Sequence, residues 1–209
     1  MERVLRHMTE VVILARHGES TASARGLVNG DPRRTVGLSG RGREEARRLG
    51  EQIGADDIDL CVVTQFPRTT ETADIALASR SVPRLVVEEL NDPRVGDLEG
   101  GPIEDLREWF RRNGALARIP GGGEHRVEVV RRYGRGLRRI LDRTERAALV
   151  IAHGLPVTYA VRASRGEDLP LTLEGVQVDH AVPYRLSRAD VERAIAGMER
   201  WARKRDDAA

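Results

Sequence analysis

Five short runs rich in β-branched and other apolar residues alternate along the chain with longer stretches of helical period. The runs are VVILA (11–15), LCVVT (60–64), RLVVE (84–88), ALVIA (148–152) and AVPYRL (181–186). Such alternation produces parallel strands joined by crossover helices, and continuous apolar runs suit strands covered on both faces. We therefore expect an α/β fold with a doubly wound, mostly parallel sheet and helices on both faces.

The segments between these runs carry helix signals. Ser39 can cap a helix whose apolar residues recur at helical spacing, and another helix is expected after Pro67. A third helix carries one apolar stripe at steps of three and four residues, formed by Val127, Val130, Gly134, Leu137 and Leu141. Residues 155–164 and 189–203 also show helical period. With 209 residues and 40% hydrophobic content, we expect one domain spanning 1–209.

The charge balance argues against a partner that is a polyanion. Charged residues make up 33% of the chain, but the formal net charge is only +2, so no global field attracts nucleic acid. Cys61 is the only cysteine, which excludes an internal disulfide and a cysteine-based metal cage. No apolar stretch has the length of a signal peptide or a membrane span, so we expect a cytoplasmic protein without a membrane partner.

Groups suited to phosphate follow three of the predicted strands at the point where each strand ends. Arg16 and His17 come directly after the first run, Arg68 follows the second, and His153 and Gly154 follow the fourth. Crevices form beyond the carboxyl ends of the strands in open α/β sheets. We therefore expect these side chains to converge, although they are distant in sequence.

This combination of residues favours phosphoryl chemistry. A neutral imidazole nitrogen is a good nucleophile toward phosphorus, and the adjacent Arg16 lowers the pKa of His17 toward that reactive form. Two guanidinium groups can clamp the equatorial phosphoryl oxygens, and His153 can add a third donor. Any one of these residues alone would more often have a structural or solvent role. Their joint placement reverses that preference.

The same segments resemble the motifs of the histidine phosphatase superfamily, also called the phosphoglycerate mutase-like family. Mutases of that family usually carry an aromatic-rich segment after RHG, where this chain has TASARGLVNGD (21–31), so the phosphatase branch is favoured. The motifs stand in the family order: RHGES (16–20), LSGRGREEA (38–46), RTTETA (68–73), LNDPRVGDLEG (90–100), PGGGEH (120–125) and VIAHG (150–154). Six matches in one order make the resemblance specific.

The resemblance implies that His17 becomes phosphorylated, without a metal or an organic cofactor. The residues implied to hold the phosphoryl group are Arg16, Ser23, Arg68, His153 and Gly154. Ser23 stands where the family has a phosphate-binding Asn seven positions after the first Arg, and its hydroxyl can donate one hydrogen bond. The phosphate clamp is therefore expected to persist in a weaker form at this position.

The loop LNDPRVG (90–96) carries the implied general acid. The family usually has a Glu two residues after the Leu, and here that position is Asp92, whose side chain is shorter by one methylene. Glu89, which directly follows the preceding run, is the alternative acid, and its other interpretation is a solvated residue at a strand end. We expect Asp92 to be the acid.

Two further segments bear on the substrate. Glu124 and His125 lie in the glycine-rich loop that borders the pocket in the family, so they are candidate substrate contacts, unless the loop is only a flexible turn. Residues 100–120 carry aromatic side chains and arginines. In the family this region covers the active site, while a helix that merely packs on the sheet is an equally good interpretation.

The leading hypothesis is a metal-independent phosphomonoester hydrolase, in which water attacks a phosphohistidine at position 17. Its expected partner is a small phosphorylated metabolite. A mutase, in which a second substrate hydroxyl accepts the phosphoryl group, is the first alternative. A non-catalytic member that binds a phosphorylated ligand is the second. The clamp residues suit many phosphomonoesters alike, and the sequence carries no signal of oligomeric state.

Overall fold

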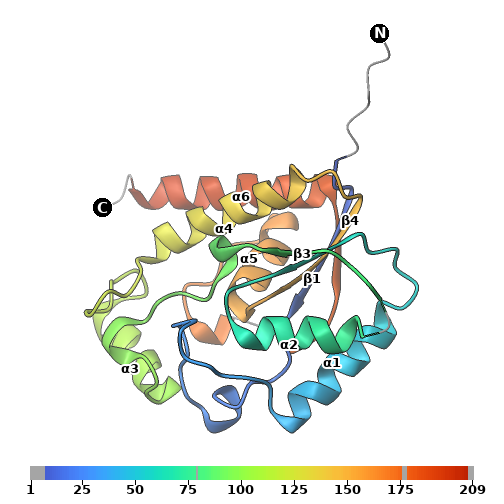
Figure 1. Ribbon diagram of the computed structural model, residues 1–209. Coiled ribbons are helices and arrows are strands. Elements are labelled where there is room, and N and C mark those ends of the chain that lie inside the picture. Colours follow the sequence, from blue (N-terminus) through green and yellow to red (C-terminus); the bar gives the residue numbers. More distant parts are fainter. Residues whose placement is uncertain (1–7, 79, 176–177, 207–209) are drawn as a thin grey trace.

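The computed structural model describes residues 8–78, 80–175 and 178–206 (Figure 1). In that part of the chain, five strands form one sheet in the order β3-β2-β4-β1-β5. The strands are β1 (Val11–Arg16), β2 (Leu60–Val63), β3 (Arg84–Val86), β4 (Ala147–Ala152) and β5 (Tyr184–Ser187). The first four are parallel, and β5 pairs antiparallel with β1 at the edge. The predicted mostly parallel α/β sheet is confirmed.

The burial of each strand follows its sequence. Every residue of β2 is buried, as is β4 from its second residue on, because helices cover both faces of the sheet at these central strands. The edge strand β5 begins at Tyr184, three residues later than predicted. Ala181 adopts a left-handed backbone with φ 54°, and Pro183 has no N–H to donate to a neighbouring strand.

Helices lie on both faces, as expected. On one face, α1 (Gly40–Gln52) and α2 (Pro67–Ala76) pack through residues such as Leu49 and Ala73. On the other face lie α4 (Arg126–Leu141), α5 (Gly154–Ser164) and α6 (Arg188–Asp206), which bury the larger core (Figure 1). Each crossover thus brings the chain back to the same end of the sheet, where the next loop begins.

A close backbone contact ties the first turn of α1 to the loop after β1. Ser39 caps the helix as predicted, since its Oγ accepts the N–H of Gly42 at 3.0 Å. A Cβ on Gly42 would overlap the carbonyl oxygen of Glu19, and a Cβ on Gly18 would overlap the carbonyl oxygen of Gly42. The two glycines therefore let the helix press directly on the loop that follows β1.

The segment 100–120 lies beyond the strand ends, and we call it the cover. Its helix α3 (Ile103–Asn113) stands apart from the sheet (Figure 1). The cover has a small apolar core of its own, made of Val28, Val95, Leu106 and Ile119 with Leu98, Ile103, Trp109 and Phe110 packed against them. Among the described residues, no helix combines the length and apolar character that crossing a membrane requires.

We predict that Gly42→Ala lowers the free energy of unfolding by on the order of 2 kcal/mol, because the new methyl group overpacks against the loop after β1. Gly40→Ala, in the same turn, is the matched control. A Cβ there meets nothing within 4 Å, so its effect should stay within about 1 kcal/mol and tend toward stabilisation. Urea unfolding midpoints compare the two variants. Equal midpoints would show that α1 can shift away from the loop freely.

Candidate active site

Three neighbouring strands deliver the candidate residues to one place. Arg16 is the last residue of β1 and pairs in register with Ala152, the last residue of β4. The backbone N–H of His17 donates to the carbonyl of Ala152 at 2.9 Å. Since β4 lies between β1 and β2, His153 stands directly between the ends of the other two strands. The expected convergence of groups at the strand ends is therefore observed.

His17 is 3% exposed, and its two ring contacts fix its tautomer. Nδ1 lies 2.7 Å from the carbonyl oxygen of Gly18, which can only accept, so Nδ1 carries the proton. Nε2 receives the Nε–H of Arg68 at 2.9 Å and therefore presents its lone pair. Burial, followed by the charges of Arg68 and Arg16, holds the pKa of His17 well below its ordinary value. The ring is thus neutral, with a nucleophilic Nε2.

The guanidinium of Arg68 connects groups from several segments of the chain. It is 3% exposed and lies 4.1 Å from the centre of the Phe66 ring. Besides His17, its N–H groups donate to Asp92 Oδ2 at 3.0 Å and to His153 Nδ1 at 3.1 Å. They also reach the side-chain and backbone oxygens of Asn29. Burial lowers the pKa of Arg68 while Asp92 opposes that shift, and the group remains a cation at neutral pH.

His153 is fully buried and stands at the N-cap of α5. Its Nε2 lies 2.9 Å from the hydroxyl of Thr64, the residue that follows β2. Burial, followed by the charge of Arg68, lowers the pKa of His153 well below its ordinary value. Gly154, in the first turn of α5, lines the same cavity, so the helix N-terminus adds a partial positive charge there.

Arg16 contributes a second cation with unused donors. One of its terminal nitrogens donates to the carbonyl of Val178 at 3.2 Å, while its buried Nε has no hydrogen-bond partner among the residues that the structure describes. Burial lowers the pKa of Arg16, and the charges of Asp92 and Glu45 oppose that shift. A buried donor without a partner is costly unless a ligand satisfies it. Arg16 is therefore suited to hold an anion.

Two side chains of the loop after β1 lie at the site, Ser23 and Asn29, and the sequence analysis identified only Ser23. Ser23 lines the cavity, with its Oγ 2.8 Å from that of Ser20. Asn29, which sequence reasoning missed, accepts from Arg68 and donates to Glu99 Oε1 at 3.2 Å. The loop that carries Asn29 has no periodic pattern, so nothing local in the sequence marks it.

The acid loop places Asp92 at the site and Glu89 away from it. The carboxylate of Asp92 is bound to Arg68 and lies 3.4 Å from Nδ1 of His153. Burial raises the pKa of Asp92 against the opposing charges of Arg68 and Arg16. Glu89 instead pairs with Arg139 at 3.2 Å and lines only a neighbouring cavity. Of the two candidate acids, the structure brings Asp92 to Arg68 and His153.

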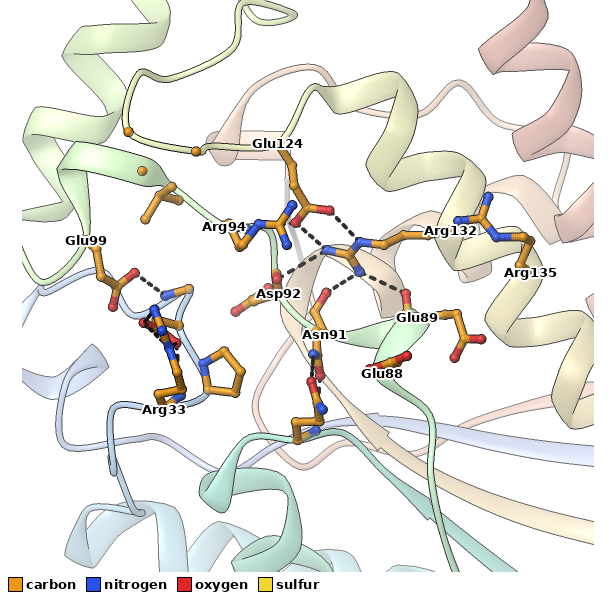
Figure 2. A pocket seen from close by; sticks show the side chains of 18 residues that line it. Arg33, Glu88, Glu89, Asn91, Asp92, Arg94, Glu99, Glu124, Arg132 and Arg135 are labelled. Atoms are coloured by element: carbon orange, nitrogen blue, oxygen red, sulfur yellow. Dashed lines mark hydrogen bonds and ion pairs between the residues drawn. The ribbon is translucent and has the colours of Figure 1, made fainter.

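Arg132 on α4 holds the acid loop, a role that no local pattern in the sequence indicates. Its guanidinium donates to the backbone carbonyls of Glu89 at 2.8 Å, Asn91 at 2.7 Å and Asp92 at 3.2 Å. It also forms a two-pronged pair with Glu124 at 2.8 and 2.9 Å (Figure 2). Burial raises the pKa of Glu124, but the pair with Arg132 outweighs it, so the net shift is downward.

The two candidate substrate contacts of the glycine-rich loop differ in position. Glu124 lines the cavity, although its carboxylate is engaged by Arg132 and by the backbone N–H of Arg94 at 2.9 Å. His125 does not line the cavity. Its Nδ1 accepts the N–H of Val127 at 3.3 Å and so caps α4, in a capping box with Glu128. The structure thus gives His125 a helix-capping position.

Two cavities meet at Asp92. The first, of about 340 Å³, contains the groups around His17 and is closed on its far side by the cover, which contributes residues from Ile103 to Ile119. The second, of about 860 Å³, is lined largely by charged and polar side chains (Figure 2). Asp92 lines both. Residues 100–120 therefore do border the site, as the covering interpretation expects.

His180 lies behind the site, bridged through its backbone to Arg16. Its ring centre is 5.8 Å from that of His17, and its Nδ1 is 3.9 Å from Glu45 Oε2. Burial, followed by the charge of Arg16, lowers the pKa of His180 to about 4. This histidine is therefore neutral in the folded protein at neutral pH.

We predict from this shift a measurable pH dependence of stability. An imidazole in the unfolded chain titrates near pH 6.5, so between about pH 6.5 and pH 4 the unfolded chain binds a proton that folded His180 does not. The contribution of neutral His180 to the free energy of unfolding is therefore complete above this window and is lost as the pH falls through it. For His180→Asn, the free energy of unfolding near pH 5 should depend on pH less steeply than in wild type, by about 1.4 kcal/mol per pH unit. Parallel curves from urea unfolding would contradict this.

Comparison with known proteins identifies the family. The profile of the histidine phosphatase superfamily (branch 1) matches residues 12–171. A 2,3-bisphosphoglycerate-dependent phosphoglycerate mutase of Methylobacterium sp. (strain 4-46) is 31% identical over 198 residues, covering 86% of this chain and 92% of the mutase. The adenosylcobalamin/alpha-ribazole phosphatase of Escherichia coli is 32% identical over 100 residues, covering 48% of each chain.

Solved structures agree with this similarity. The alpha-ribazole phosphatase of Shigella flexneri superimposes with a TM-score of 0.71 at 25% identity, covering 84% of this chain and 89% of that one. The profile match runs from β1 past α5, and so it includes Arg16, His17, Arg68 and His153 near the strand ends and Asp92 in the acid loop. The chain belongs to the histidine phosphatase superfamily, whose members similar to it include both phosphatases and mutases.

Proposed function

We propose that this chain is a metal-independent phosphomonoester hydrolase that carries the phosphoryl group on His17. One observation supports it above all: a single guanidinium, that of Arg68, contacts both the neutral nucleophilic nitrogen of His17 and the carboxylate of Asp92. The attacking atom, a phosphate-binding cation and an acid thus belong to one hydrogen-bonded network. A phosphoryl group bound to this guanidinium lies within reach of the other two groups.

In the first step, Nε2 of His17 attacks phosphorus and the P–O bond to the leaving alcohol breaks. Arg16 and Arg68 offer charged donors to the phosphoryl oxygens. In the structure, Nδ1 of neutral His153 accepts from Arg68. When a phosphoryl oxygen takes that place on Arg68, the other tautomer of His153 can form: the Thr64 hydroxyl then donates to Nε2, and the proton on Nδ1 is donated to a third oxygen. We assign Asp92 as the general acid: burial shifts its pKa upward, and in its protonated form the carboxyl passes its proton to the departing oxygen.

In the second step, water replaces the histidine on phosphorus. Asp92, now a carboxylate, takes a proton from the attacking water, the P–N bond breaks, and neutral His17 and inorganic phosphate result. Asp92 lines both cavities, which supports this role. The larger polar cavity gives water a route to the side of the phosphohistidine where Asp92 stands. The cations that neutralise the phosphoryl group come from the chain itself, so the reaction is expected to persist in EDTA.

The mutase alternative has an observation in its favour. The phosphoglycerate mutase of Methylobacterium aligns over 92% of its length, so overall chain length does not separate the two activities. A mutase would transfer phosphate from the enzyme to a second substrate hydroxyl in preference to water. Release of inorganic phosphate from a phosphomonoester, compared with its transfer to an added acceptor alcohol, distinguishes the two.

We predict that His17→Ala abolishes turnover. Without Nε2 no covalent intermediate can form, whereas the cations of the pocket still bind phosphate. Wild-type protein mixed briefly with labelled substrate in EDTA should carry an acid-labile, base-stable label on His17, detected by mass spectrometry. Label on a serine or aspartate would contradict the mechanism. Wild-type protein that binds phosphate but never hydrolyses p-nitrophenyl phosphate would instead be the non-catalytic member of the family.

We predict that Asp92→Asn acts selectively on poor leaving groups. A proton donor matters most when the departing alkoxide is a strong base, so kcat/KM for alkyl phosphates should fall by about 100-fold or more. For p-nitrophenyl phosphate it should fall much less. The comparison uses kcat/KM because this ratio reports the first phosphoryl transfer and not the later attack of water.

Glu89→Gln is the matched control for Asp92→Asn. Glu89 lies in the same loop and pairs with Arg139 outside the site, so its variant should show no dependence on the leaving group. Equal loss on both substrates in Asp92→Asn would mean that this carboxylate is structural. A selective loss in Glu89→Gln would make Glu89 the acid.

A further inference from the structure

The cavity around His17 extends away from the strand ends into an apolar chamber under α3. The phosphoryl-binding groups occupy one end. The opposite part is lined by apolar side chains: Val28, Ile103, Leu106, Phe110, Ile119 and Val129. The whole cavity has a volume of about 340 Å³, enough for a small organic alcohol beyond the phosphate. The alcohol of the substrate is therefore expected to have an apolar body.

A buried cation, Arg126, lies on the wall of this chamber. It is 6% exposed and belongs to the first turn of α4. One of its terminal nitrogens donates to the Tyr159 hydroxyl at 3.4 Å, and its guanidinium carbon lies 5.6 Å from the centre of the Phe110 ring. No carboxylate pairs with it among the residues that the structure describes. A buried charge without a counterion is costly, so this one calls for an anionic ligand.

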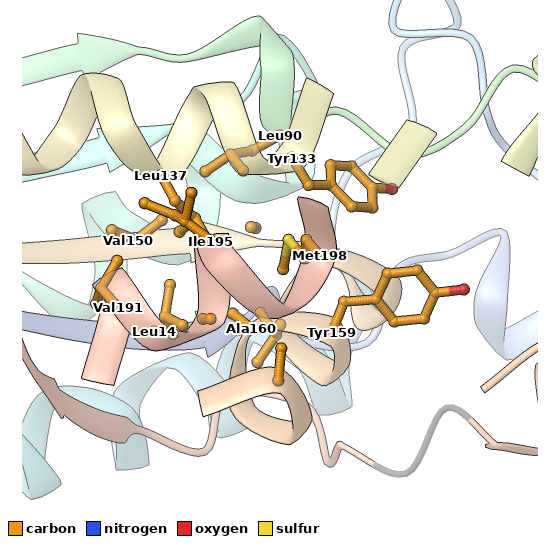
Figure 3. Close-up of a cluster of buried hydrophobic side chains, with 14 of the residues drawn as sticks. Leu14, Leu90, Tyr133, Leu137, Val150, Tyr159, Ala160, Val191, Ile195 and Met198 are labelled. Atoms are coloured by element: carbon orange, nitrogen blue, oxygen red, sulfur yellow. The ribbon is translucent and has the colours of Figure 1, made fainter. Parts of the chain in front are cut away.

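The position of the Arg126 side chain is well defined. The Tyr159 hydroxyl donates to the carbonyl of Pro170 at 2.7 Å, which leaves its oxygen lone pairs to accept from Arg126. Figure 3 shows the Tyr159 hydroxyl directed away from the apolar core in which its ring is packed. Tyr159 and Phe110 thus hold the guanidinium at the wall without neutralising its charge.

The described residues that line the cavity carry an excess of positive charge, as Arg126 does by itself. Five arginines line it: Arg16, Arg68, Arg94, Arg107 and Arg126. Its two carboxylates are already engaged, Asp92 by Arg68 and Glu124 by Arg132, which lies outside this cavity. Arg107 has carboxylate partners of its own, because it pairs with Glu104 and its Nε lies 3.6 Å from Glu174 Oε1. The buried charge that remains unneutralised at the α3 end is therefore that of Arg126.

We propose that Arg126 is an anion-binding subsite for the leaving group. The substrate is then a phosphomonoester whose alcohol has an apolar body and ends in a second anionic group. This inference rests on the proposed hydrolase function, because the phosphate must occupy the His17 end. It selects a substrate class that the phosphoryl clamp alone does not distinguish, since Arg16 and Arg68 contact only the group being transferred.

The test compares two series of substrates matched in chain length, alkyl phosphates and ω-carboxyalkyl phosphates. At the best length, wild-type protein should prefer the carboxylate by about tenfold or more in kcat/KM, as expected for a hydrogen bond between charged groups in a buried site. Arg126→Met keeps an apolar side chain but removes the charge, so the ratio should fall toward one. Arg126→Lys should retain part of the preference.

Arg135→Met is the matched control. Arg135 also lies on α4, but it is exposed and lines only the larger polar cavity, so the variant should keep the wild-type ratio. Equal hydrolysis of both series by wild-type protein would overturn the subsite and leave the hydrolase function standing. An unchanged ratio in Arg126→Met would also overturn the subsite.

A binding measurement makes the inference independent of turnover and of how the variant folds. Wild-type protein should bind ω-carboxyalkylphosphonates more tightly than alkylphosphonates of equal length, measured by calorimetry, since these analogues cannot be hydrolysed. Equal affinities would overturn the subsite. A preference for the carboxylate in a protein that hydrolyses neither phosphate series would support the subsite while refuting the hydrolase function.

Discussion

The buried guanidinium of Arg68 is the interaction on which the site depends. It contacts groups from four segments that are distant in sequence: His17 after β1, Asn29 in the following loop, Asp92 in the acid loop and His153 after β4. A cation so deeply buried is stable only because acceptors surround it. The same partners are the groups that phosphoryl transfer needs, so one set of contacts orders the loops and prepares the site for a dianion.

Burial also sets the protonation states. It lowers the pKa values of His17 and His153 and raises that of Asp92, so it shifts each group in the direction of its neutral form. Neutral His17 is the form that can attack, and neutral Asp92 is the form that can donate a proton. Arg132 maintains this arrangement from outside, because it binds the backbone of the acid loop and the carboxylate of Glu124 together.

The sheet and the cover form different ends of the cavity. The strands and their flanking helices hold the phosphoryl end rigidly, since the first turn of α1 and the loop after β1 are in direct backbone contact. The cover around α3 has a separate small core and forms the wall where the alcohol would lie. A substitution on α3 can therefore change the leaving group that is accepted without moving the phosphoryl clamp.

The sequence by itself determined the strands, the helices and the strand ends that carry Arg16, His17 and His153, because these follow from local apolar period and chain order. Tertiary structure decided the rest. Asp92 and Glu89 are three residues apart, and only the path of the loop over α4 turns one toward Arg68 and the other toward Arg139. His125 caps a helix, a position its neighbours in the sequence did not reveal. The partners of Asn29, Arg126 and Arg132 depend on side chains far along the chain, since a buried charge is matched in space and not in sequence.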